Sequence, residues 1–270
     1  MASLRYATSN LVESDSIAAS PALETSLPEA NLLDTRRAYP ARSTSTAAQA
    51  ITGDFAANAT LDFGMIWGHN LTDSATWRLR LYSAITQGGS VLYDSTATAC
   101  HSANLFDDWA AARRFAVDYF TQQTTVRSFK LDITDAANPD GYLQIGQFWL
   151  GEYTELTKQI LHGFSHVADG GAKIITPPGG GSYASQPYTG GPVRKVTAGV
   201  QLTTQADRNA WATFMRKSGA GQAVWVDPFP TDADDQQHID HAMLGLVQGK
   251  EPVVNRVRNI YRSKLTITEV

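Results

Sequence analysis

The sequence contains a single cysteine, Cys100, among its 270 residues, and no apolar run approaches the roughly 20 residues that cross a bilayer. One cysteine excludes an internal disulfide and is typical of a protein that assembles in a reducing compartment or is indifferent to redox conditions. The first residues lack a basic start followed by an apolar segment, so we expect no secretory signal. A net charge of −4 argues against general nucleic-acid binding, which basic residues drive by displacing counterions.

Motifs for phosphate and metal binding are also missing. The glycines at residues 176–191 are not followed by Lys and Ser or Thr, which excludes a P-loop. His162 and His166 have the spacing of helix-borne ligands, but Gly163 between them argues against a helix. The sequence QHIDH at residues 237–241 is better explained as an exposed polar turn than as a metal site. We therefore expect no metal and no cofactor.

Candidate catalytic groups are few. Cys100 and His101 are sequence neighbours, but neighbours on a strand point to opposite faces and no third group orients the imidazole. Asp107 and Asp108 have the same limitation, because the carboxylates of a glycosidase converge across a cleft from separate strands. We expect no enzyme. A cell-wall hydrolase would need converging carboxylates or a metal, and no residues support one.

The first half of the chain consists of short alternating segments bounded by Gly, Pro and Asn. In residues 76–82, Trp77, Leu79 and Leu81 alternate with Arg and Tyr, which predicts a strand with one face open to water. This pattern predicts a mainly β protein with an N-terminal sandwich or jelly roll. The other strands expected in this half lie near residues 5–8, 31–33, 59–67, 90–95 and 124–133.

The segment YLQIGQFWLGEY, residues 142–153, closes this half. Its apolar residues alternate at first and then run together through Phe148, Trp149 and Leu150, as in a strand buried on both faces. The turn before it, residues 138–141, contains a Pro and a Gly that supply the fixed and the positive φ of a reversal. We place a domain boundary after this segment, which predicts domains of residues 1–153 and 154–270.

The second predicted domain is a smaller β domain with one α-helix at about residues 204–218. Thr204 is the expected N-cap, Asp207 completes a capping box, and Gly219 provides a left-handed stop. The apolar face of the helix consists of Ala210, Trp211, Phe214 and Met215. Strands are expected at residues 193–202, 223–226, 243–247 and 260–270, and a long Gly/Pro loop at residues 176–191.

Short motifs in both halves resemble proteins of tailed-bacteriophage tails. Residues 41–44, 51–55, 68–71, 78–82, 93–95 and 149–151 resemble a discoidin-like, galactose-binding-type jelly roll. Residues 196–202, 204–217, 224–228 and 265–269 resemble the β domain of distal-tail or baseplate-ring proteins. Together the two resemblances span nearly the whole chain.

This resemblance implies a structural protein of the virion that is assembled in the host cytoplasm. Copies of the chain would form a cyclic ring at the tail tip, joining the tail tube to baseplate hub and fibre proteins. Rings of this kind arise when a heterologous interface closes on itself. We expect no membrane partner and no specific nucleic acid. Residues 1–50 and 176–191 are expected to be arms that become ordered only against neighbouring subunits.

The alternative is a carbohydrate-binding, receptor-recognition module of the tail tip, with a host glycan as its partner. Sugar-binding jelly rolls use loop aromatics with Arg or Asn side chains at one end of the sandwich. His69, Asn70, Trp109 and Arg113 would supply such a set here. A glycan array separates the two hypotheses, because a ring component should bind nothing and a receptor binder should give a defined hit.

Overall fold

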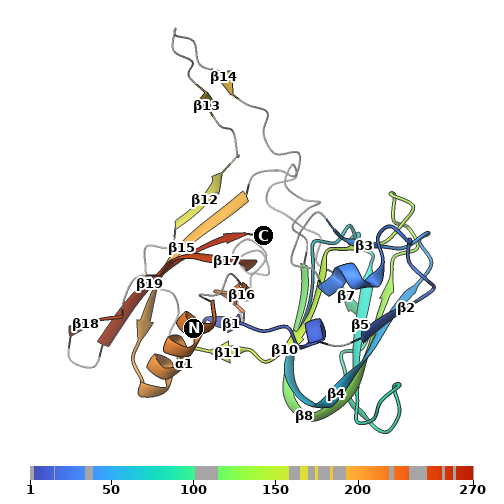
Figure 1. Cartoon of the computed structure of the whole chain (residues 1–270), viewed down its shortest axis with the longest axis horizontal. Coiled ribbons are helices and arrows are strands. Elements are labelled where there is room, and N and C mark those ends of the chain that lie inside the picture. The colour runs from blue at the N-terminus through green and yellow to red at the C-terminus, as the bar shows by residue number, and fades with distance from the viewer. Residues whose placement is uncertain are drawn as a thin grey trace. The chain divides into compact units, whose positions relative to one another are not determined.

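The computed structural model forms two compact units (Figure 1). Within the described part of the chain, residues 9–153 form the N-terminal unit, and residues 3–8 together with residues from 154 onwards form the C-terminal unit. The predicted division placed residues 1–153 in one domain, so the two divisions differ at the N-terminus. The structure describes residues 3–14, 16–33, 39–100, 115–157, 165–169, 174–175, 183–184, 193–218, 222–230, 242–250, 253–257 and 260–269.

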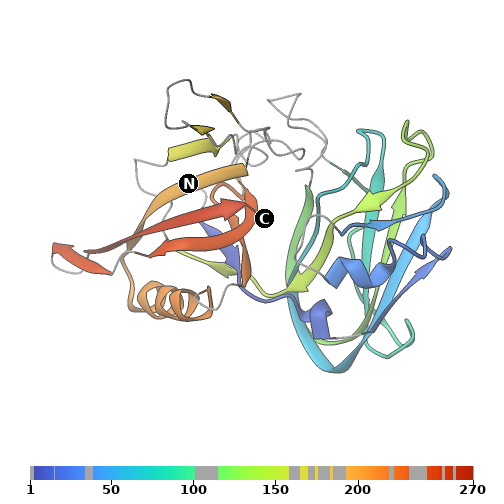
Figure 2. The same cartoon turned by 45° about the horizontal axis from the view of Figure 1, so that its top comes forward.

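Two long antiparallel strands, β4 (Gln49–Trp67) and β8 (Phe115–Thr134), organise the N-terminal unit. Their register shifts between Asp54 and Phe63, and Figure 2 shows both ribbons curving strongly, as irregular pairing allows. Each strand therefore contributes to both layers of a sandwich. In one half of the β4–β8 pair, β2 (Ser16–Ser20) pairs with β4 and β5 (Thr76–Tyr82) pairs with β8. Strands β6 (Val91–Asp94) and β7 (Thr98–Ala99) both pair with β5. In the other half, β10 (Gln147–Gly151) pairs with β4.

The core of the N-terminal unit lies between these layers. The Phe129 ring is 5.7 Å from that of Phe55 and 5.4 Å from that of Phe148 on β10, centroid to centroid. On β5, the inward side chains Trp77, Leu79 and Leu81 are buried, while the arginines between them are partly exposed. The predicted sandwich of jelly-roll type and the predicted half-open strand at residues 76–82 are confirmed.

Strand β10 is buried at all five of its residues, as the apolar run predicts. Asn10 covers its outer edge: its Nδ2 donates to the Phe148 carbonyl (2.8 Å), and its Oδ1 accepts from the Leu150 amide (3.0 Å). The turn before this segment has Gly141 at φ +79°, a left-handed conformation that glycine adopts without strain. The sequence therefore predicts both the strand and the turn that leads to it.

Two local predictions differ from the structure. Residues 31–33 lie in a 3₁₀-helix, η2 (Glu29–Leu33), instead of a strand, and the Asn31 amide donates to the Pro28 carbonyl at 3.0 Å. A run of two leucines is too short to show a period, so the Pro-initiated turn decides the conformation. The strand predicted at 59–67 is the second part of the longer β4, which begins at Gln49 and has a short exposed stretch at residues 56–58. A second 3₁₀-helix, η1, spans Leu11–Ser14, and β3 (Ala41–Arg42) pairs with β9 (Gln144–Ile145).

The C-terminal unit is built on a second antiparallel sheet with the order β11-β1-β16-β17-β19-β15-β12, and β18 pairs with β19. The N-terminal strand β1 is an interior strand of this sheet, with Arg5 opposite both Glu155 and Asp227. The predicted strands at 193–202, 223–226, 243–247 and 260–270 are all present. The bounds are β1 (Arg5–Ala7), β11 (Thr154–Glu155), β12 (Ser165–Asp169), β15 (Val193–Leu202), β16 (Ala223–Asp227), β17 (Met243–Lys250), β18 (Val254–Val257) and β19 (Ile260–Glu269), and a separate pair is formed by β13 (Ile174–Ile175) and β14 (Tyr183–Ala184).

Helix α1 (Gln205–Lys217) has the predicted capping box, in which the Asp207 amide donates to Thr204 Oγ1 (2.9 Å) and the Thr204 amide to Asp207 Oδ2 (3.2 Å). Trp211 and Phe214 on its predicted apolar face are fully buried. The expected stop at Gly219 lies outside the described residues. In the part of the chain that the structure describes, α1 is the one α-helix, and no helix there is long and apolar enough to cross a membrane.

Candidate functional site

The structure describes two of the four predicted carbohydrate contacts, and both belong to the turn after β4. His69 is fully buried, and its Nδ1 accepts from the Leu71 amide at 3.2 Å. Asn70 Nδ2 donates to Asp140 Oδ2 (2.8 Å) and to the Tyr142 carbonyl (3.0 Å), while its Oδ1 accepts from the Gln144 amide (2.8 Å). Both side chains therefore hold the turn in place, and neither presents its polar groups to a ligand in this conformation. Trp109 and Arg113 lie outside the described residues, and their role stays a prediction.

Asn70 is the centre of a polar group at this end of the sandwich, which we call the loop cluster: Arg42, Asn70, Asp140, Tyr142 and Gln144. The Arg42 guanidinium lies 4.2 Å from the centroid of the Tyr142 ring, in cation–π geometry. It also donates to Gln144 Oε1 through Nη2 (2.7 Å) and Nε (3.2 Å). Tyr142 is half-buried, and Asp140 is exposed. The cluster thus joins β3, the turn after β4 and the segment leading into β9.

A second layer of hydrogen bonds fixes the loop that carries Asp140. The buried carboxylate of Asp135 accepts from the Thr72 amide (2.8 Å), the Thr72 hydroxyl (2.8 Å) and Asn138 Nδ2 (2.9 Å). Asn138 Oδ1 in turn accepts from the Asp140 amide at 3.0 Å, the local side-chain bond by which Asn shapes turns. The exposed carboxylate therefore stands on a loop with little freedom to move.

The loop cluster has the chemistry of a shallow recognition site. The half-buried Tyr142 ring offers an apolar surface, and the exposed Asp140 carboxylate on the same loop offers acceptor oxygens. Sequence reasoning missed Arg42, Asp140 and Tyr142 as site residues. Arg42 and Gln144 are 102 positions apart, and only the pairing of β3 with β9 brings them together. The available signal was an Asn-Pro-Asp-Gly turn followed at once by an aromatic residue.

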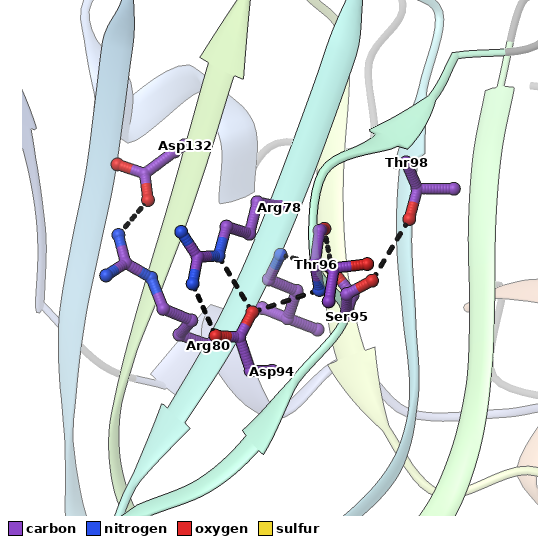
Figure 3. Close-up of polar contacts among 8 residues, drawn as sticks. Arg78, Arg80, Asp94, Ser95, Thr96, Thr98 and Asp132 are labelled. Atoms are coloured by element: carbon purple, nitrogen blue, oxygen red, sulfur yellow. Dashed lines mark hydrogen bonds and ion pairs between the residues drawn. The ribbon is translucent and has the colours of Figure 1, made fainter.

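A second polar cluster lies on the outer face of β5, β6 and β8 (Figure 3). Arg78 donates to Asp94 through Nε (2.8 Å) and Nη2 (2.5 Å), and Arg80 pairs with Asp132. The hydrogen bond from Arg78 lowers the pKa of Asp94 to about 2. Asp94 also accepts from the amide of Thr96, whose φ of +57° is left-handed. Since these charges are paired within the sheet, we assign the cluster a structural role in fixing β6 against β5.

A tyrosine and a carboxylate join β6 to the other half of β8. The Tyr93 hydroxyl donates to Asp118 Oδ2 at 2.5 Å, and the Tyr93 ring stacks on Phe120 with centroids 4.2 Å apart. Burial raises the pKa of Asp118, and the hydrogen bond from Tyr93 opposes this shift. Burial also raises the pKa of Tyr93, so the phenol remains the donor. This contact ties an edge strand to the opposite layer of the sandwich.

The candidate catalytic and metal-binding groups are only partly described. Cys100 is 2% exposed, and burial raises the pKa of its thiol to about 12, so the thiol is protonated at neutral pH. His166 lies on strand β12, not on a helix. Among the described residues, no group of three or more His, Cys, Asp or Glu side chains could hold a metal ion. His101, Asp107, Asp108, His162 and the QHIDH segment lie outside them.

The C-terminal unit has a groove of about 270 Å³ between β1 and α1. Tyr6 forms part of its floor, and burial raises the pKa of this phenol to about 12. The hydroxyl is therefore protonated and hydrogen-bonds with the Thr154 side chain. The remaining walls mix polar and apolar groups: Thr8, Asn209, Ala210, Thr213, Phe214 and Lys217.

Comparison with known proteins finds no matching family model and no matching curated protein. Solved structures resemble about half of the chain. A GH29 fucosidase from Ruminococcus gnavus, in complex with fucose, is 11% identical with a TM-score of 0.41, and the match covers 54% of this chain and 27% of the fucosidase. The chitosan-binding module 1 of a Paenibacillus sp. IK-5 chitosanase/glucanase is 12% identical with a TM-score of 0.39, covering 53% of this chain and 99% of the module. A fucose-binding module from Streptococcus pneumoniae is 10% identical with a TM-score of 0.39, covering 53% and 94%.

Proposed function

We propose that the chain is a non-enzymatic recognition protein of a phage tail tip, whose N-terminal unit binds a host-surface glycan at the loop cluster. The observation that carries this proposal is that Asn70 Nδ2 donates both to Asp140 Oδ2 (2.8 Å) and to the backbone carbonyl of Tyr142 (3.0 Å). One amide thereby holds an exposed carboxylate and the backbone of an aromatic residue on the same loop. The similar structures include a chitosan-binding module and a fucose-binding module, and a glycan is the ligand class proposed here.

The chemistry of a sugar suits these groups. The apolar face of a pyranose ring packs on an aromatic side chain, while its hydroxyls donate to carboxylate oxygens such as those of Asp140. Because the loop is held by Asp135 and Asn138, binding costs little ordering of the protein. A shallow site of this size binds weakly on its own, and the many copies of a tail-tip protein would raise the apparent affinity through multivalency.

A glycan array probed with the full chain tests the proposal. We expect a defined group of glycans to bind, and we expect Asp140→Ala and Tyr142→Ala to weaken that binding at least about tenfold, or 1.4 kcal/mol. Asp73→Ala is the matched control, because Asp73 is an exposed acid in the turn after β4 and lies outside the loop cluster. An array without hits, or variants that bind as well as the wild type, would contradict the proposal.

A ring-forming structural role at the tail tip is the second candidate, and its support is the resemblance of segments in the C-terminal unit to distal-tail proteins. The segments that resemble distal-tail proteins pack together: β15 and β19 pair over eight positions, and Trp211 of α1 shares one core with Val224 and Ile267. A closed ring would join copies through a heterologous interface. Light scattering and negative-stain images of the purified chain test this role, with closed rings as the expected result. A monomer that also fails to assemble on purified tail tubes would contradict it.

A further inference from the structure

We infer that the loop cluster selects neutral sugars over acidic ones, and that Asp140, positioned by Asn70, sets this preference. The inference rests on the proposed function, since it concerns the same site. It follows from the different surroundings of the two charged groups of the cluster, the Arg42 guanidinium and the Asp140 carboxylate. The positive group is engaged by side chains of the cluster, and the negative group belongs to an exposed residue.

The Arg42 guanidinium is occupied by two side chains of the same cluster. Its guanidinium covers the Tyr142 ring at 4.2 Å, and two of its N–H groups converge on Gln144 Oε1 at 2.7 and 3.2 Å. The residue as a whole is only partly exposed. A carboxylate on a ligand would have to break the bonds to Gln144 to obtain the fork geometry that guanidinium offers to acids.

Asp140 is the outward-facing charge. The residue is exposed, and one of its carboxylate oxygens, Oδ2, accepts from Asn70 Nδ2 at 2.8 Å. Each carboxylate oxygen has two lone pairs, so a bond to Asn70 leaves acceptor capacity for ligand donors. Neutral sugar hydroxyls are such donors. The ionised carboxylate of a uronic or sialic acid cannot donate a hydrogen bond, and its charge is repelled by the Asp140 carboxylate.

Asn70 acts as a positioning residue for this carboxylate. Its Nδ2 donates both to Asp140 and to the Tyr142 carbonyl at 3.0 Å, so one amide sets the distance between the carboxylate and the aromatic residue. The Asp140 amide is held separately by Asn138 Oδ1 at 3.0 Å. The carboxylate is thus fixed from two sides before a ligand arrives, which favours donors that match its orientation.

The experiment is an array of matched pairs, in which each neutral glycan stands beside its sialylated or uronate-capped counterpart. We expect the wild-type chain to bind the neutral member at least about tenfold more tightly, equivalent to 1.4 kcal/mol. Asp140→Asn removes the charge and keeps the shape, so it should reduce this ratio to below about threefold. Asp73→Asn makes the same charge change in the neighbouring turn and should leave the ratio unchanged.

Asn70→Ala separates positioning from general support of the loop. A positioning role predicts weaker binding of the neutral member and a smaller neutral-to-acidic ratio, whereas a merely structural role lowers both affinities alike. Wild-type preference for acidic glycans, or an unchanged ratio in Asp140→Asn, would overturn the inference while leaving glycan binding itself intact. Binding to no member of any pair would overturn the proposed function as well.

Discussion

Tyr6 of β1 packs edge-on against Phe214 of α1, with ring centroids 4.7 Å apart, so a residue from the start of the chain completes the core of its second half. Tyr6 also meets Trp211 edge-on at 6.3 Å and is buried. Strand β1, which carries Tyr6, pairs with β16 on one side and β11 on the other. The C-terminal unit therefore depends on residues that precede the N-terminal unit in sequence.

Tyr6→Ala should destabilise the C-terminal unit by about 3–5 kcal/mol, because truncating a buried aromatic side chain leaves a cavity beside Trp211 and Phe214. Urea unfolding followed by circular dichroism and tryptophan fluorescence measures this change. Tyr39→Ala is the control, since Tyr39 is 45% exposed and its loss should change stability by less than about 0.5 kcal/mol. Equal effects of the two substitutions would show that Tyr6 does not support the core as its packing implies.

Thr86→Gly should stabilise the N-terminal unit slightly, by up to about 1 kcal/mol. Thr86 and Gln87 have φ of +54° and +56°, a left-handed conformation that costs a β-branched residue more than glycine. The Asp54 carboxylate holds the Thr86 amide at 2.7 Å, and the Ser128 hydroxyl holds the Gln87 amide at 3.1 Å. The measurement is the urea midpoint, with Thr121→Gly on the exposed face of β8 expected to destabilise. A loss of stability in Thr86→Gly would contradict the assignment of strain to this turn.

Asp94→Asn should remove an acid-sensitive part of the stability. The hydrogen bond from Arg78 holds the pKa of Asp94 at about 2 in the folded protein, below the value of 3.8 for a free side chain. A depressed folded pKa contributes stability that is present above about pH 4 and is lost as the pH falls towards 2. The difference in unfolding free energy between wild type and variant should therefore be constant above that range and shrink below it. A difference that grows on acidification would contradict this linkage.

Asp118→Asn should show the opposite dependence on pH. Burial raises the pKa of Asp118, so ionising this carboxyl costs the folded state more than the unfolded state. The contribution of the protonated form is complete below the unfolded pKa and is lost as the pH rises through the raised folded pKa. Relative to wild type, the variant should thus become more stable as the pH rises from about 3 to neutrality. Parallel unfolding curves for both proteins across this range would refute the shift.

Short-range patterns in the sequence predicted the helix and the strands whose formation depends on neighbouring residues. The capping box of Thr204 and Asp207, the alternation at residues 76–82 and the fully apolar strand at residues 223–226 each depend on neighbours within a few positions. Partners distant in sequence were not predictable in this way. The pairing of Arg5 with Asp227 spans most of the chain, and no local signal shows that β1 leaves its own half.

The loop cluster illustrates the same limit for the candidate site. Asn70 was identified from its place beside His69 in a turn, but its bonds to Asp140 and Gln144 depend on how the β8–β9 segment folds over that turn. Sequence reasoning therefore named one residue of the loop cluster, Asn70, together with a histidine that is buried. It missed Asp140 and Tyr142, whose exposure and orientation are set by tertiary structure.

The most direct test of the central claim is an amide NMR titration of the ¹⁵N-labelled chain with a glycan selected on the array. If the loop cluster is the binding site, the largest shifts should occur at Asn70, Asp140, Tyr142 and Gln144, and they should disappear in Asp140→Ala. Shifts confined to other surfaces, such as the outer face of β5 and β6, would place binding elsewhere and contradict the account.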